Sequence, residues 1–164
     1  MPDRSKTPLL DDVHQPSDLK RLNASGLLDQ ARNPDYPFAM SSRRLPRSHN
    51  TWTQNSHRLV KGKNPCTVQM NSADAARLSL EDGQLAQVAS PTGSIQLPVE
   101  INDDMFEGVV SIPQGWGHNR ADTGMTVAES QPGVSINDVT DAQRIDVLTG
   151  NAAFNGTQVA IQAA

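Results

Sequence analysis

Cysteine is almost absent from the sequence: Cys66 is the only one among 164 residues. An internal disulfide is therefore excluded, and so is a metal or iron–sulfur centre built from cysteines of this chain alone. Long apolar runs are also missing, and Met1 to Lys6 lead into no apolar core of the kind that a signal peptide needs. We therefore expect a soluble, cytoplasmic chain that makes no membrane contact of its own.

Aromatic residues are scarce too, at 4%, whereas Gly and Pro number 11 each and hydrophobic residues make up 36%. This composition is typical of many loops around a modest aliphatic core rather than of a helix bundle. Positive charge does not dominate either, because 14 Lys and Arg stand against 18 Asp and Glu. No basic stripe is available to neutralise a nucleic-acid backbone, so nucleic acid is not an expected partner.

The usual signatures of nucleotide and metal sites are also missing. No Gly-x-Gly-x-x-Gly or Walker loop occurs, which removes support for the ordinary nucleotide-binding folds. The histidines match no short zinc-ligand spacing; they are His14, His49, His57 and His118. Cys66 falls on the inward face of a predicted strand, and we interpret it as a core thiol.

The chain divides into an arm and a domain. Residues 1–34 are polar with scattered Pro and a weak helical pattern of leucines, so we predict a linker or connecting arm that can be disordered. A single domain over residues 35–164 follows, which at this length buries about two thirds of its unfolded surface.

Short β-like runs separated by turn signals fill this domain. The clearest spans Ser94–Ile101, where Ile95, Leu97 and Val99 alternate with polar residues and Pro98 requires a local edge or bulge. A helix of about two turns is predicted over Ala73–Leu78, capped by Asn71 or Ser72. One further predicted strand ends at Arg43-Arg44. The others span Cys66–Met70, Gln84–Ser90, Val109–Ile112 and Val159–Ile161. About six strands with little helix favour a small, nearly closed barrel.

Three polar loops, at 47–56, 113–120 and 133–138, hold most of the unusual chemistry. Glycines beside Trp116 allow a ligand to approach the main chain. Loops rich in Asn, Ser and Thr are more often solvated than ligand-binding, so both interpretations stay open. Asp138 and Asp141 resemble an acid–base pair only weakly, because they fall in a predicted turn and no substrate is indicated.

Five short motifs occur in a fixed order: Ser48–Asn55, Met70–Gly83, Gly108–His118, Ser135–Asp138 and Leu148–Gly156. Together they resemble the carboxy-terminal molybdopterin dinucleotide-binding domain of the dimethyl-sulfoxide reductase family, which includes formate dehydrogenases and nitrate reductases. The resemblance covers about residues 36–162, and its tryptophan loop is most similar to the formate-dehydrogenase-like branch.

The resemblance implies a mainly β fold, a six-stranded double-psi β-barrel with one or two short helices. Such a barrel closes over a bis(molybdopterin guanine dinucleotide) cofactor, whose molybdenum or tungsten is held by dithiolenes and not by this chain. The implied partner is the remaining catalytic domains or subunit of an oxidoreductase, without which this chain is not expected to catalyse. The residues that we expect to contact the cofactor are Arg43, Arg44, Ser48, His49, Asn50, Trp52, Asn55, Gly117, His118 and Asn137.

Two other interpretations stay open at this point. A stand-alone double-psi barrel can serve as an interaction or substrate-recognition module. A small barrel enzyme of the aspartate-decarboxylase type is less favoured, because its self-processing Gly-Ser step finds only Gly93-Ser94, which lies in a predicted hairpin.

Overall fold

The structure, a computed structural model, describes residues 33–120, 124–145, 150–152 and 154–164. The linker predicted for residues 1–34 therefore lies almost entirely outside the described residues, and its nature stays a prediction. None of the helices in the described segments is long and apolar enough to span a membrane.

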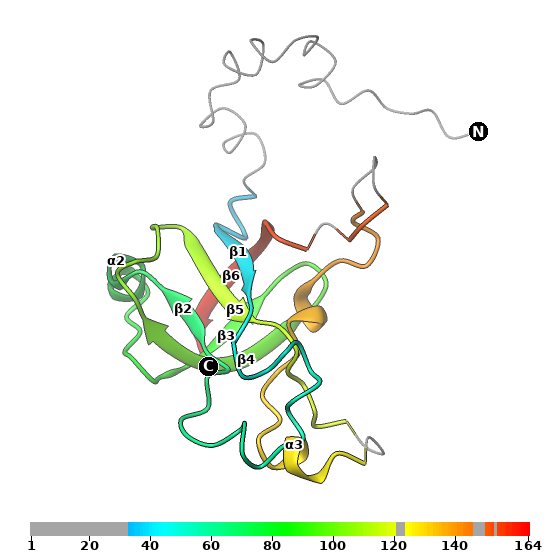
Figure 1. Cartoon of the computed structure of the whole chain (residues 1–164). Coiled ribbons are helices and arrows are strands. Elements are labelled where there is room, and N and C mark those ends of the chain that lie inside the picture. The colour runs from blue at the N-terminus through cyan, green and yellow to red at the C-terminus, as the bar shows by residue number, and fades with distance from the viewer. Residues whose placement is uncertain (1–32, 121–123, 146–149, 153) are drawn as a thin grey trace, which may run out of the picture. The chain divides into compact units, whose positions relative to one another are not determined.

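Six strands close into a barrel (Figure 1), as the sequence predicted. In chain order they are β1 Phe38–Arg43, β2 Val68–Met70, β3 Leu85–Ala89, β4 Ser94–Ile101, β5 Val109–Pro113 and β6 Thr157–Ala163. Around the barrel the order is β1-β5-β2-β4-β3-β6, with β1·β5 and β2·β4 parallel and the other pairs antiparallel. The fold is a double-psi β-barrel, and closure leaves neither edge of the sheet open.

Strand β4 shows how the sequence sets this geometry. Ile95, Leu97 and Val99 are buried while Ser94, Gln96 and Pro98 are exposed, because side chains alternate across a strand. Pro98 is registered with Leu85 of β3, but β2 pairs with β4 only from Val99 onward. On the side of β2, strand β4 is therefore locally an edge at Pro98, as predicted.

Helix α2, Ser72–Arg77, covers one side of the barrel. Its cap is Asn71, whose side chain accepts a hydrogen bond from the N–H of Ala73 at 2.8 Å. The Asp74 carboxylate is fully buried and accepts from the N–H of Gly108 at 2.7 Å, while its other oxygen pairs with Arg77. These contacts join α2 to the turn that precedes β5.

The core consists of the inward side chains of all six strands, including Met40, Met70, Val88, Leu97 and Ile112. Helix α3, Thr126–Ser130, and the 3-10 helix η2, Ile136–Val139, are the other short helices among the described residues. Ile136 and Val139 of η2 pack in the core, and these contacts anchor η2 and its neighbouring residues to the barrel.

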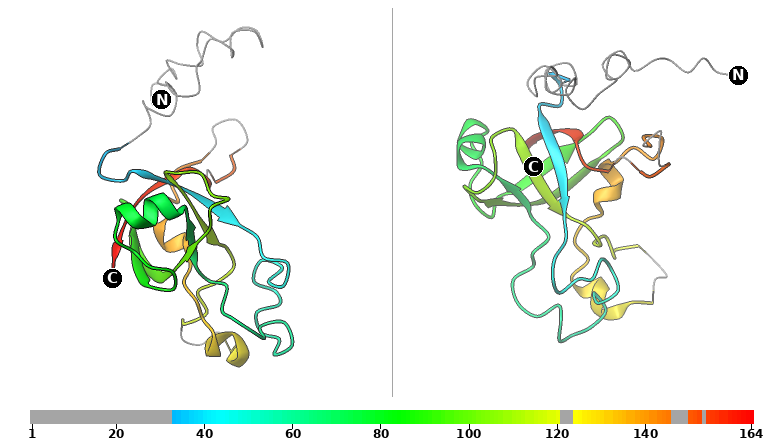
Figure 2. Two further views of the ribbon diagram at one scale, coloured as in Figure 1. Left: turned by 90° about the vertical axis from the view of Figure 1, so that its left-hand side faces the viewer. Right: turned by 45° about the horizontal axis from the view of Figure 1, so that its top comes forward.

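The long loops leave one end of the barrel together (Figures 1 and 2). Because β1 and β5 are parallel, their carboxyl ends lie at the same end, and the segments that follow them start side by side. Arg43 is registered with Pro113, and the N–H of Gln114 donates to the carbonyl of Arg43 at 3.1 Å. The segments that begin at residues 44 and 114 thus become neighbours although they are far apart in sequence.

Candidate functional site

A hollow of about 450 Å³ opens at this end of the barrel. It draws residues from four segments: the loop after β1, the loop after β5, the stretch that enters η2, and the stretch before β6. Its lining residues are Arg44, Asn50, Thr51, Gln114, Gly115, Trp116, Ser135, Ile136, Asn137 and Phe154. The three polar loops singled out in the sequence therefore meet in one place.

The first two loops are locked together at Gly115. This glycine has φ +86°, and a Cβ placed on it would lie 2.0 Å from the carbonyl oxygen of Asn50. Asn50 itself takes the left-handed conformation, with φ +59°, and its side-chain oxygen accepts from the amide of Gln114 at 3.0 Å. Only glycine at 115 permits this approach, so the floor of the hollow depends on it.

Gly117 and His118 brace the tryptophan loop rather than line the hollow. Their N–H groups donate to the carbonyl of Pro132 at 2.8 and 3.1 Å. The buried His118 ring places Nε2 3.3 Å from Thr51 Oγ1 and 3.1 Å from the carbonyl oxygen of Gly115. Their predicted contacts with a cofactor stay predictions, whereas their support of the loop is visible.

Arg44 and Asn137 are two polar side chains of the hollow that remain uncommitted. Both are exposed, and neither side chain has a hydrogen-bond partner within the part of the chain that the structure describes. Arg44 offers five N–H donors and positive charge, and Asn137 offers two donors and an acceptor. Together they present groups that a polar, anionic ligand can use.

Arg43 turns away from the hollow and serves the barrel. Its guanidinium donates to the carbonyls of Ser111 and Pro65 and to Thr67, and it lies 3.7 Å from a Glu100 oxygen. Burial lowers the pKa of Arg43, and the negative charge of Glu100 opposes this shift. The neighbouring basic residues thus lie in different environments, which the sequence does not distinguish.

The pKa of Glu100 is lowered as well, for different reasons. Burial alone raises the pKa of its carboxyl, but hydrogen bonds from Thr67 and Gln69 and the charge of Arg43 outweigh burial. The pKa of Glu100 therefore falls below its ordinary value, and the carboxylate stays ionised.

The other predicted residues of the first loop lie outside the hollow. Ser48 is buried and donates to the carbonyl of Leu45 at 3.0 Å, and Asn55 accepts from the N–H groups of Val127 and Ala128 at the start of α3. His49 and Trp52 are exposed and do not line the hollow. Their roles in binding stay predictions.

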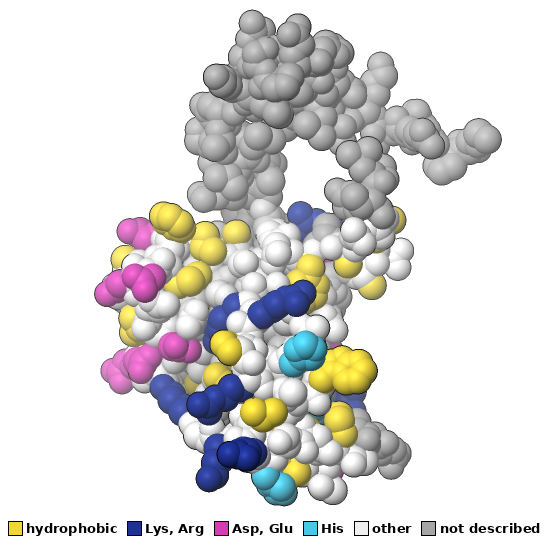
Figure 3. Space-filling model, in the orientation of Figure 1, with side chains coloured by type: hydrophobic (Ala, Val, Ile, Leu, Met, Phe, Trp, Pro, Cys, Tyr) yellow, Lys and Arg dark blue, Asp and Glu magenta, His cyan; other side chains and the backbone are white. Residues whose placement is uncertain are grey.

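Several lining residues are absent from the predicted set, including Thr51, Gln114 and Ser135. One signal in the sequence was missed: residues 36–73 contain Arg43, Arg44, Arg47, Arg58, Lys61 and Lys63 but no Asp or Glu. In Figure 3 the acidic side chains lie along the left edge of the face shown, and most of the Lys and Arg side chains lie to the right of them or below them. The net charge of −4 conceals this separation.

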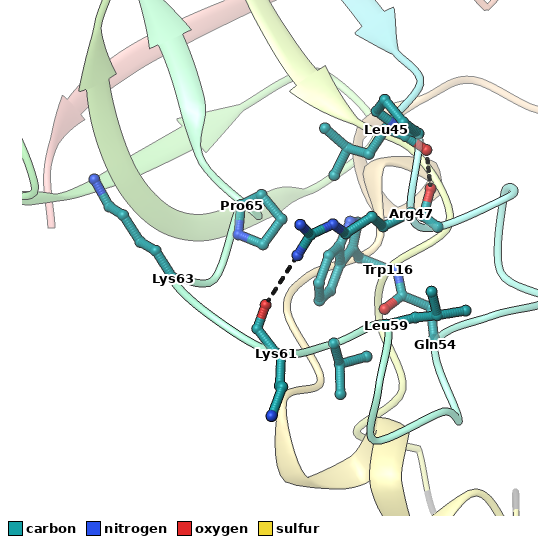
Figure 4. A pocket seen from close by; sticks show the side chains of 11 residues that line it. Leu45, Arg47, Gln54, Leu59, Lys61, Lys63, Pro65 and Trp116 are labelled. Atoms are coloured by element: carbon teal, nitrogen blue, oxygen red, sulfur yellow. Dashed lines mark hydrogen bonds between the residues drawn. The ribbon is translucent and has the colours of Figure 1, made fainter.

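A second cavity, of about 270 Å³, lies against Trp116 and is lined mainly by the segment between β1 and β2 (Figure 4). The buried nitrogens Gln54 Nε2 and Trp116 Nε1 belong to residues that line it, and among the described residues these two atoms lack hydrogen-bond partners. An unsatisfied buried donor costs about 1–3 kcal/mol.

Asp138 and Cys66 have contacts that explain them without catalysis. The Asp138 carboxylate accepts from Arg120 at 2.8 Å. Cys66 is buried, with Sγ 3.4 Å from the N–H of Val134, and burial raises the pKa of its thiol. Cys66 is a core thiol, as predicted, and it stays protonated.

Comparison with known sequences assigns the family. A sequence model described as "Molydopterin dinucleotide binding domain" matches residues 38–158, and the chain belongs to this family. The match spans β1 to the start of β6 and includes every residue that lines the hollow. It does not favour the stand-alone interaction module.

Curated relatives are whole oxidoreductase subunits. The chain is 33% identical over 81 residues to F420-dependent formate dehydrogenase subunit alpha of Methanocaldococcus jannaschii, covering 48% of this chain and 12% of that protein. It is 33% identical over 91 residues to a nitrate reductase of Klebsiella oxytoca, covering 54% and 10%. The chain thus spans about a tenth of the length of these relatives.

Among solved structures, acetylene hydratase from Pelobacter acetylenicus aligns with a TM-score of 0.68 at 17% identity. The alignment covers 84% of this chain and 20% of that protein. At this identity the likeness concerns the fold alone.

Proposed function

We propose that this domain binds and orients part of a bis(molybdopterin guanine dinucleotide) cofactor as the carboxy-terminal domain of a molybdenum or tungsten oxidoreductase. A formate-dehydrogenase-like parent is the specific form of this proposal, supported by the tryptophan loop and by the relative from M. jannaschii. The remaining catalytic domains or subunit of that oxidoreductase are the proposed partner.

The observation that carries the proposal is the hollow with its free polar groups. A pterin presents donors and acceptors along its edge, which the amide of Asn137 can match on both counts. The guanidinium of Arg44 suits the negative charge of the pyrophosphate. The residues present therefore fit the group, with Thr51 and Ser135 as further hydroxyl partners and Trp116 as an apolar wall.

The chemistry divides between the cofactor and the chain. When bound, the metal–dithiolene unit supplies the redox reaction, while the protein supplies orientation and electrostatic tuning. Cys66 is the only thiol and is buried, so we expect a thiolate ligand to the metal to come from the partner. Gly115 and Gly117 hold the loops in register, which keeps the donors of the hollow in place before the cofactor arrives.

Cofactor retention tests the proposal. The chain is co-expressed with the catalytic portion of its oxidoreductase, and pterin content per protein is measured by fluorescence of the oxidised pterin after gel filtration. Arg44→Gln and Asn137→Ala each remove a hydrogen bond to a polar or charged partner, so we expect binding to weaken about tenfold or more.

The matched controls are Arg58→Gln and Asn119→Ala, which change exposed residues of the same type outside the hollow. Both should retain the wild-type pterin content. Equal retention by Arg44→Gln, Asn137→Ala and these controls would refute the assignment of the site. Failure of the wild-type chain to raise retention above that of the catalytic portion alone would refute the function itself.

A further inference from the structure

Gly93 lies in the turn that joins β3 to β4, and it differs from the other glycines that the structure describes. Each of those has a positive φ, which favours glycine, whereas the φ of Gly93 lies outside that range. What excludes a side chain at this position is a neighbour. A Cβ placed on Gly93 would lie 2.5 Å from the backbone carbonyl oxygen of Asp138, in η2.

Both partners of this contact are held in place. The N–H of Ser90 donates to the carbonyl of Gly93 at 2.8 Å, and the Ser90 hydroxyl accepts from the N–H groups of Thr92 and Gly93 at 3.1 and 3.3 Å. On the other side, η2 is anchored in the core by Ile136 and Val139. A methyl group added at Gly93 therefore meets a fixed backbone, and one of the two segments must move.

The segment that Gly93 contacts is the one that brings Asn137 to the hollow. The Asn137 side chain has no hydrogen-bond partner among the described residues, so the backbone of η2 determines where its amide lies. Gly117 approaches the start of the same segment, where a Cβ would lie 2.9 Å from the backbone nitrogen of Ser135. Close backbone approaches thus bound this segment at both ends.

We propose that Gly93 is a positioning residue for the hollow. By letting the β3–β4 turn contact the carbonyl of Asp138, it fixes η2 where the Asn137 amide meets the edge of the pterin. Gly93 itself does not line the hollow, so it acts through η2 and not on the ligand. Hydrogen bonds have narrow ranges of distance and angle, so a small displacement of η2 weakens this contact. The inference rests on the proposed function, because it takes the Asn137 amide as a contact to the cofactor.

Gly93→Ala tests the positioning in the full chain without a cofactor. We expect the backbone and side-chain amide signals of Asn137 to shift in a ¹H–¹⁵N NMR spectrum, because η2 yields to the added methyl group; Asn137→Ala assigns the side-chain signals. Thr92→Ala changes an exposed neighbour in the same turn and should leave these signals in place. Ser90→Ala removes the hydroxyl that closes the turn without adding an atom to the contact. It should shift the same signals less, and it carries the test if Gly93→Ala does not fold.

Release of the cofactor shows whether this position matters for binding. In the complex with the catalytic portion, we expect Gly93→Ala and Asn137→Ala each to speed the release of pterin about tenfold, because both lose the same hydrogen bonds. The double variant should release pterin no faster than Asn137→Ala, since Gly93 acts only through that amide. Independent effects would instead multiply to about a hundredfold. Thr92→Ala should release pterin at the wild-type rate, and any effect of Ser90→Ala should disappear in the Asn137→Ala background.

Two results would overturn the inference. One is a Gly93→Ala chain that folds with the Asn137 signals unchanged, which would show that the turn and not η2 gives way. The other is multiplied effects in the double variant, which would show that Gly93 acts on the hollow by another route or on the fold in general. Equal pterin content with and without the wild-type chain would refute the proposed function, and this role with it, even if the Asn137 signals shift.

Discussion

Replacing Gly115 with alanine tests the contact that joins the two loops of the hollow. The substitution has two costs. A left-handed backbone costs a residue with a side chain about 1–2 kcal/mol, and Gly115 has φ +86°. The new Cβ would also lie 2.0 Å from the carbonyl oxygen of Asn50, so one loop must move. Overpacking of this kind costs about 1–3 kcal/mol.

Gly83→Ala separates these two costs. Gly83 has nearly the same backbone conformation, with φ +81°, but a Cβ there would have no neighbour within 4 Å. Both variants share the backbone cost and the gain from a stiffer unfolded chain. The difference between them therefore isolates the steric contact, and we expect Gly115→Ala to be less stable than Gly83→Ala by about 1–3 kcal/mol.

Urea unfolding followed by tryptophan fluorescence gives the free energies of unfolding, with the buried Trp116 as the reporter. Equal midpoints and slopes for the two variants would show that the loops are not held at Gly115, and the account of the hollow's floor would fail.

Two further predictions concern contacts away from the hollow. Asn55→Ala removes the side-chain acceptor from the N–H of Val127, which should cost about 1 kcal/mol of unfolding free energy and speed hydrogen exchange at that amide, with Asn119→Ala as a neutral control. Glu100→Gln should lower stability at pH 7. Because the pKa of Glu100 is depressed in the folded protein, its contribution is present above the unfolded value of about 4.3 and is lost as pH falls through the folded value. Denaturation curves for wild type and Glu100→Gln should therefore converge at low pH, whereas a constant gap, or an equal effect of the exposed Glu107→Gln, would contradict this account.

The alternation of apolar and polar residues along the sequence was sufficient to predict the strands and which of their side chains face the core. The alternation around Ile95 and Leu97 identifies the buried face of β4, and Asn71 marks the start of α2, because both depend on neighbours in sequence. The parallel pairing of β1 with β5 follows from no local pattern, because it joins Met40 to Val110 across most of the domain. The resemblance, not periodicity, implied that topology.

Individual binding residues were harder to predict than the loops that carry them. Asn50, Asn55 and Asn137 offer the same amide chemistry, yet Asn50 bonds to Gln114, Asn55 caps α3, and the Asn137 side chain has no partner among the described residues. The difference lies in which N–H groups the fold brings near each amide. The same holds for Trp52 and Trp116, where only the second is covered.

The position of β6 in the barrel restricts the order in which the domain can assemble. This strand lies between β1 and β3, and its Val159 is registered against Phe38. Until β6 is in place, β1 and β3 each have a row of unpaired backbone groups, with which strands of other chains can pair. Pairing β6 with β1 closes a loop that contains all the other strands, and closing a long loop is slow. We therefore expect the domain to fold slowly and to be prone to aggregation until β6 is paired. The strand that completes the barrel is thus also the one that ends this vulnerability.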